Sequence, residues 1–92
     1  MEFEWDPEKA AANLAKHKVS FEEAATVFGD PLARIVSDPR HSSEEERFVL
    51  LGLSQDQRLI AVMYVDRGEA IRMIGARPAT RHERRNYEET TQ

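Results

Sequence analysis

The 92-residue sequence contains no cysteine and no long apolar stretch. Without cysteine the chain has no disulfides, no thiolate zinc ligands and no thiol nucleophile. No segment approaches the run of about 18 apolar residues that a membrane-spanning helix needs. Residues 1–7 carry Glu2, Glu4 and Asp6 where a signal peptide has basic and apolar segments. We therefore expect a cytoplasmic protein that makes no contact with a membrane.

Metal-binding motifs are also missing from the sequence. The three histidines, His17, His41 and His82, show neither HxH nor HExxH spacing, and no cluster of carboxylates accompanies them. We expect no metal site and no cofactor.

Net positive charge, the usual mark of a nucleic-acid-binding domain, is lacking too, since the formal net charge is −4. The charges are unevenly distributed, however. Residues 67–85 contain six arginines against Glu69 and Glu83, a local charge of +4. Phosphate binding depends on the local potential, so an acidic chain can still present a basic face to RNA.

Two helices are predicted near the N-terminus. Asp6 before Pro7 is typical of an N-cap with proline in the first turn, and strong helix formers continue to residue 17. Ser20 and Glu23 form a capping box for a second helix, whose apolar residues repeat at helical spacing until residue 28. Because only a few residues join the two helices, we expect them to pack as a hairpin.

The rest of the chain predicts strands and one more helix. Four short apolar runs, separated by turn-like segments, occupy residues 32–37, 47–54, 59–65 and 70–77. Phe3 and Trp5 alternate with acidic residues, which indicates an additional N-terminal edge strand. A capping box at Thr80 and Glu83 predicts a helix over 81–89. We expect a single α+β domain over residues 1–92, in which the helical hairpin covers an antiparallel sheet of about four strands and a helix follows.

Residues along nearly the whole chain resemble, in order, those typical of the BrnT toxins. They are Phe3, Glu4, Trp5, Asp6, Lys9, Asn13, Lys16, His17, residues 19–22, Ala24, Val27, Phe28, Glu46, Arg47, Gly52, Arg67, Gly68, Ile71, Arg72, Ile74, Ala76, Arg77, Ala79, Thr80, Glu83, Arg84 and Tyr87. The resemblance implies a RelE-like fold and metal-independent RNA cleavage. It also implies an antitoxin similar to BrnA, a ribbon-helix-helix protein that binds DNA, so that the toxin meets DNA only through it. Gly75 stands where the family usually has serine, which puts the level of activity in question.

Metal-free RNA cleavage needs a base for the 2′-hydroxyl, cations at the phosphate and an acid for the leaving oxygen. Arginine suits the phosphate because its planar fork binds two oxygens at once. Arg72 and Arg77, five residues apart on one strand, are expected on opposite faces, and we favour Arg77 because it ends the strand. The predicted catalytic residues are Arg77, Arg47, His17, Lys16, Glu46 and Tyr64, and the predicted RNA-binding residues are Arg67, Arg72, Arg81 and Tyr87.

Each of these residues also has an ordinary structural explanation. An arginine such as Arg77 or Arg47 can form a surface ion pair with a carboxylate. Lys16 and His17 complement the dipole at the end of a helix, and Tyr64 shares a strand face with apolar residues. Two further functions therefore stay open. One is a non-catalytic antitoxin-binding module, and the other, a DNA-binding regulator acting alone, lacks a helix-turn-helix pattern.

Overall fold

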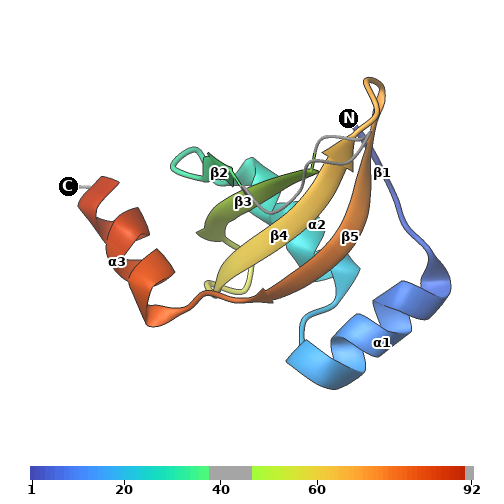
Figure 1. Ribbon diagram of the computed structural model, residues 1–92, viewed down its shortest axis with the longest axis horizontal. Helices are drawn as coiled ribbons and strands as arrows, with labels where there is room; N and C mark the ends of the chain where they lie inside the picture. The colour runs from blue at the N-terminus through green and yellow to red at the C-terminus, as the bar shows by residue number, and fades with distance from the viewer. Residues whose placement is uncertain (38–46, 91–92) are drawn as a thin grey trace.

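A five-stranded sheet with helices on both faces and along one edge makes up the chain (Figure 1). The computed structural model describes residues 1–37 and 47–90. The elements in chain order are β1 (Glu2–Glu4), α1 (Pro7–His17), α2 (Phe21–Thr26), the 3₁₀ turn η1 (Val27–Gly29), β2 (Arg34–Ser37), β3 (Arg47–Leu53), β4 (Leu59–Asp66), β5 (Ala70–Pro78) and α3 (Arg81–Thr90). The predicted α+β class is confirmed.

The strands lie in the order β1-β5-β4-β3-β2. Neighbouring strands from β2 to β5 are antiparallel, whereas β1 joins the outer side of β5 in parallel, with Phe3 opposite Ile71. The expected four-stranded antiparallel sheet was therefore wrong in number and in one pairing. Parallel pairing is available to β1 because two helices and three strands separate it from β5, and a parallel pair needs such a long connection.

Caps fix the beginnings of both N-terminal helices where the sequence predicts them. The Asp6 carboxylate accepts a hydrogen bond of 2.9 Å from the Glu8 backbone N–H, and the Ser20 hydroxyl accepts one of 3.0 Å from the Glu23 N–H. Helix α1 ends at His17, and Lys18, which caps it, has a left-handed backbone with a φ of 60°. Helix α2 is shorter than its apolar repeat suggests, because the chain tightens into η1 after Thr26.

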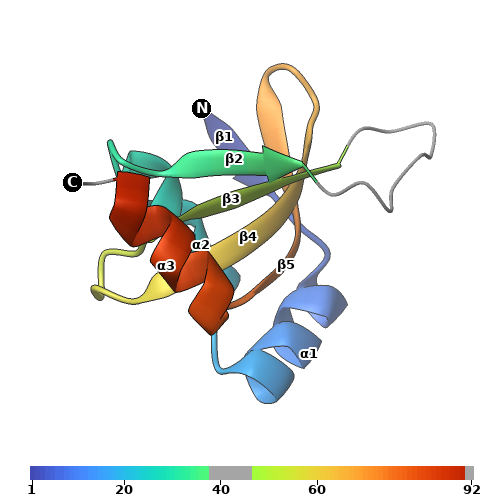
Figure 2. The ribbon, with the colours of Figure 1, turned by 60° about the vertical axis from the view of Figure 1, so that its left-hand side comes forward.

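The two N-terminal helices do not form the expected hairpin. Helix α1 lies along the outer edge of β5, and α2 lies against one face of the sheet (Figures 1 and 2). The reason is that β1 pairs only with residues 70–72 and leaves the rest of the β5 edge uncovered. Asn13 of α1 hydrogen-bonds that edge, and Val19, fully buried, directs the chain from α1 into the core. The helices are thus held by the sheet and not by each other.

Two apolar clusters lie on opposite faces of the sheet. We name these faces the α2 face and the α3 face after the helices that cover them (Figure 2). Because side chains alternate along a strand, each central strand supplies both clusters. The α2-face core comprises Val19, Phe21, Ala24, Val27, Leu50, Ile60, Val62, Tyr64, Ile71, Met73 and Ala76. The smaller α3-face core comprises Val49, Leu51, Leu59, Ala61 and Tyr87.

Candidate active site

An irregularity in β5 decides which arginines share a face. Between Met73 and Gly75, β5 holds one residue more than β4 beside it. Such a bulge shifts the alternation of side chains by one position. Met73 and Ala76 consequently both lie in the α2-face core, although they are three residues apart. Their neighbours Arg72 and Arg77 therefore both lie on the α3 face, and the expectation that they lie on opposite faces was wrong.

Arg77 forms a two-pronged ion pair with Glu83 of α3. Its Nη1 donates to Glu83 Oε1 at 2.7 Å, and its Nη2 donates to Glu83 Oε2 at 3.0 Å. The Arg77 side chain is 33% exposed and that of Glu83 is 19% exposed, so the pair is partly shielded from water. The hydrogen bonds from Arg77 outweigh burial and hold the pKa of Glu83 below its usual value. The fork of Arg77 is therefore already shaped around two oxygen atoms.

Glu83 also caps the helix on which it lies. Its Oε1 accepts a hydrogen bond of 2.8 Å from the Thr80 N–H, and its own N–H donates to the Thr80 hydroxyl at 3.1 Å. This is the capping box that the sequence predicts. Arg77 is consequently fixed both to β5 and to the first turn of α3.

Two further predicted arginines share one carboxylate at the other end of β5. Glu4 of β1 lies 3.8 Å from Arg67 Nε and 3.7 Å from Arg72 Nη1. These contacts are long and solvent-exposed, and such ion pairs contribute about 1 kcal/mol or less. Arg47, opposite Val65, is exposed on the same face. The α3 face thus carries Arg47, Arg72 and Arg77 on its strands.

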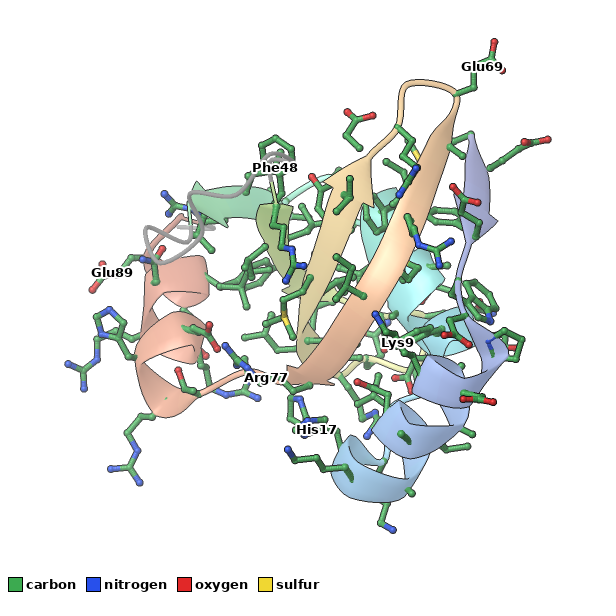
Figure 3. All side chains as sticks on the ribbon, turned by 45° about the vertical axis from the view of Figure 1, so that its right-hand side comes forward. Lys9, His17, Phe48, Glu69, Arg77 and Glu89 are labelled. Carbon is green, nitrogen blue, oxygen red and sulfur yellow. The ribbon has the colours of Figure 1, made fainter. Side chains whose placement is uncertain are left out.

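The end of α1 brings Lys16 and His17 to the edge of β5. One turn earlier, the Asn13 side chain donates to the Ala76 carbonyl at 2.8 Å and accepts from the Ala76 N–H at 3.1 Å. In Figure 3, His17 and Arg77 lie toward the same end of β5. Lys16 is exposed and His17 is half-buried. The structure therefore brings these two predicted residues to the end of the strand that holds Arg77.

The two predicted tyrosines lie in the cores and not on an open surface. Tyr64 is 5% exposed and packs between Phe28 and Phe48, with ring centroids 5.1 Å and 5.5 Å away, and burial raises its pKa. Tyr87 is 6% exposed and donates to the Asp30 carboxylate at 2.7 Å. Burial and this hydrogen bond raise the pKa of Tyr87 to about 12. We assign both tyrosines to packing and leave them out of the site.

The remaining predicted residues divide into two groups. Arg81 is exposed in the first turn of α3, beside the Arg77–Glu83 pair in sequence. Glu46, with His41, lies outside the described residues.

Sequence reasoning missed the roles of Glu83 and Asn13. Glu83 was explained by its capping box, and Asn13 gave one usable signal, a polar residue within an alanine-rich helix.

One pocket on the described surface does not suit RNA. A pocket of about 410 Å³ between η1 and the β3–β4 turn is lined by neutral side chains and the Asp30 carboxylate, which would repel phosphate. Within residues 1–37 and 47–90, no three His, Asp or Glu side chains are grouped closely enough to hold a metal ion. No helix in the described part of the chain is long and apolar enough to cross a membrane.

Comparisons with known proteins identify the family of the chain. Residues 5–83 match the family described as the ribonuclease toxin BrnT of a type II toxin-antitoxin system. The chain therefore belongs to the BrnT ribonuclease toxin family. Its structure is similar to the crystal structure of the Brucella abortus ribonuclease toxin BrnT, with a TM-score of 0.67 and 24% identity over 88% of this chain and 99% of that one. No curated protein matches the sequence.

Proposed function

We propose that the chain is a metal-independent endoribonuclease toxin whose active site lies on the α3 face, at the end of β5. The observation that carries the proposal is the fork of Arg77, which holds two carboxylate oxygens in the geometry that two phosphate oxygens require. Arg77 projects from a strand fixed on both sides, by β4 and by Asn13. A cation held in this way is preorganised to stabilise charge that develops on a phosphate.

The proposed reaction is attack of the RNA 2′-hydroxyl on the adjacent phosphate. The 2′-oxygen loses its proton and bonds to phosphorus, while the bond to the 5′-oxygen breaks and that oxygen gains a proton. The products are a 2′,3′-cyclic phosphate and a 5′-hydroxyl end. Arg77 neutralises the reacting phosphate, and Arg47, opposite Val65 at the Arg72 end of the sheet, contacts the RNA farther along. The groups proposed to move protons are Lys16, Glu46 and His17, and His17 approaches from the α2-face side of α1 around the end of β5.

RNA has to compete with carboxylates for the arginines of this site. Glu83 occupies the fork of Arg77, and Glu4 lies near Arg67 and Arg72. Exchange of a carboxylate for a phosphate keeps the charge of the arginine balanced, but it leaves the displaced carboxylate, Glu83 in the case of Arg77, without its cation, a cost that RNA binding has to offset. We propose that Arg67, Arg72 and Arg81 contact the RNA backbone.

The proposed partner is a cognate antitoxin of the BrnA type, a ribbon-helix-helix protein through which the toxin meets DNA. Membership of a type II toxin-antitoxin family implies an antitoxin, and the BrnA type follows from the resemblance. A cytoplasmic location and a RelE-like relationship are further predictions from the sequence.

An assay of the isolated chain on RNA tests the proposal. We expect cleavage to persist in excess EDTA and to leave 5′-hydroxyl ends, which a polynucleotide kinase labels without prior phosphatase treatment. Products with 5′-phosphate ends would contradict the proposed chemistry. Activity that EDTA abolishes and magnesium restores would contradict metal independence.

A second candidate function is a non-catalytic toxin homologue that mainly binds the antitoxin. The observation in its favour is that Arg67, Arg72 and Arg77 all have carboxylate partners in the chain itself. This function predicts that the isolated chain binds its antitoxin tightly but leaves RNA intact at every salt concentration. The same assay therefore separates the two functions.

A further inference from the structure

Helix α1 has a defined orientation along the edge of β5. Asn13 hydrogen-bonds both polar groups of Ala76, as a neighbouring strand would, and also donates to the Val19 carbonyl at 2.9 Å. Asn13 therefore marks the line along which α1 meets the sheet. Residues on one side of this line are turned toward the α2 face, and residues on the other side are turned toward the α3 face.

The position of Ala10 shows which side is which. Successive residues of an α-helix are rotated by about 100°, so Ala10 lies about 60° to one side of Asn13. Ala10 packs against the α2-face core. Lys9 and Lys16 lie about 40° and 60° to the other side. They are therefore turned toward the α3 face, whereas His17 falls on the side of Ala10.

The two lysines lie along the edge of β5 near Gly75. Figure 3 shows Lys9 beside β5. Gly75 presents no side chain to the α3 face, and a Cβ added to it would stand 3.7 Å from Asn13 Oδ1 and 3.1 Å from Met63 Cε. The seam between α1 and β5 therefore passes over Gly75, which the end of Met63 and the Asn13 amide bury, with the lysines on one side and Arg77 on the other.

The lysines differ from the arginines in their charge partners. Arg67, Arg72 and Arg77 all have a carboxylate within 4.0 Å. Lys9 and Lys16 are exposed, and neither ammonium makes an ion pair or a side-chain hydrogen bond with the residues that the structure describes. Within the described chain, their charge is therefore available to an external anion without displacement of an internal one.

We infer that Lys9 is an RNA-backbone contact and that Lys9 and Lys16 form a phosphate-binding row along the seam between α1 and β5. This inference rests on the proposed function and adds a subsite to it. Seven residues of helix rise about 10 Å, the span of about three nucleotides in a stacked strand. Lys16, at the end of β5 where Arg77 lies, binds near the reacting phosphate, and Lys9 binds a phosphate about three nucleotides away.

Because Lys9 lies far from the reacting phosphate, it contributes to binding and not to chemistry. The Lys9→Ala variant should therefore raise KM severalfold and leave kcat unchanged. Binding to a 2′-O-methyl RNA oligonucleotide, which lacks the attacking hydroxyl, isolates affinity from cleavage. One lost phosphate contact should reduce the slope of log affinity against log salt concentration by about 0.7.

A relocated lysine provides the matched control. Ala11 is exposed and lies about 200° around the helix from Lys9. The double variant Lys9→Ala/Ala11→Lys keeps the composition and net charge but turns the ammonium away from the seam. We expect it to bind RNA as weakly as Lys9→Ala does, with an unchanged melting temperature.

The inference is overturned if Lys9→Ala keeps the wild-type salt slope, or if the relocated lysine restores affinity, because the effect is then one of net charge. A wild-type chain that binds RNA without cleaving it refutes the proposed ribonuclease, while the salt slope still decides the role of Lys9. A wild-type chain that neither binds nor cleaves RNA refutes both.

Discussion

The ion pair between Arg77 and Glu83 can be broken from either side, which separates catalysis from stability. Arg77→Ala removes the fork proposed to hold the phosphate. Glu83→Gln removes the negative charge but keeps an oxygen for the Thr80 N–H, since glutamine also functions in a capping box. Both variants therefore lose the same ion pair, and only the first loses the cation.

The expected loss of stability follows from how far the pair is buried. Exposed ion pairs contribute about 1 kcal/mol or less, and breaking a fully buried one costs about 3–5 kcal/mol. With side chains 33% and 19% exposed, the Arg77–Glu83 pair lies between these limits. Either variant should lose about 1–2 kcal/mol of unfolding free energy, a fall of roughly 5–15 °C in melting temperature for a domain of this size.

The expected loss of activity is larger for one variant only. Removing a preorganised donor to a transition-state oxyanion costs about a hundredfold to a thousandfold in rate. We therefore expect Arg77→Ala to lose cleavage by this factor. Glu83→Gln should cleave at least as fast as wild type, because its amide competes less with phosphate for the fork. Arg77→Lys should recover only part of the activity, since an ammonium cannot bind two oxygens as the fork does.

The assay measures single-turnover cleavage of RNA by the wild type and the three variants at one temperature, about 20 °C lower than the lowest of their melting temperatures. Thermal melts of the same four proteins supply those melting temperatures. Wild-type cleavage by Arg77→Ala would remove this residue from the site. Equal loss of cleavage in Arg77→Ala and Glu83→Gln would show that the pair acts by holding α3, and the proposed contact with phosphate would then be wrong.

Three further predictions concern packing and pH. Gly52→Ala should destabilise the fold by about 2 kcal/mol or more in a denaturant titration, because the added Cβ would stand 2.7 Å from the Cβ of Ala33; an unchanged midpoint would contradict this contact. Gly75→Ser should fold with a melting temperature close to that of wild type, since its Cβ would be crowded only by the flexible end of Met63 at 3.1 Å and would stand at ordinary contact distance, 3.7 Å, from Asn13 Oδ1. A loss above about 2 kcal/mol would contradict this reasoning. Burial alone would raise the pKa of Asp30, but three hydrogen bonds to its carboxylate outweigh burial and lower this pKa. The stability that Asp30 contributes should therefore be present above about pH 4 and fall as the pH drops further. Thermal melts between pH 3 and 7 would show this fall.

Much of the fold could be predicted because its signals are local. Capping signals and short apolar runs between turn-like segments located the helices and four strands to within two residues at most of their ends. The partner strand of β1 and its parallel direction could not be predicted. The sequence of these three residues does not indicate that they pair with residues 70–72, which lie far along the chain. The helical hairpin was wrong for a related reason, since the packing of α1 depends on an edge that only the assembled sheet creates.

The site was predicted in part for the same reasons. The position of Arg77 at a strand end followed from the apolar pattern, but its partner Glu83 belongs to the next helix and had an ordinary explanation there. The bulge that brings Arg72 and Arg77 to one face did leave a signal. An isolated glycine inside a strand often marks a bulge, so Gly75 indicated that the alternation of faces could change between Arg72 and Arg77.

Two departures from a regular sheet meet at the same short segment of β5. The bulge beside Gly75 turns Arg77 to the face that already carries Arg72, and Asn13 satisfies the edge at Ala76, which β1 does not reach. A regular strand would place one arginine on each face, and a fully paired edge would exclude α1 with its lysines. Bulges concentrate beside active sites because they redirect side chains in this way. The irregular segment, and not the overall charge of the chain, is therefore what brings these basic residues together as a candidate site on an acidic protein.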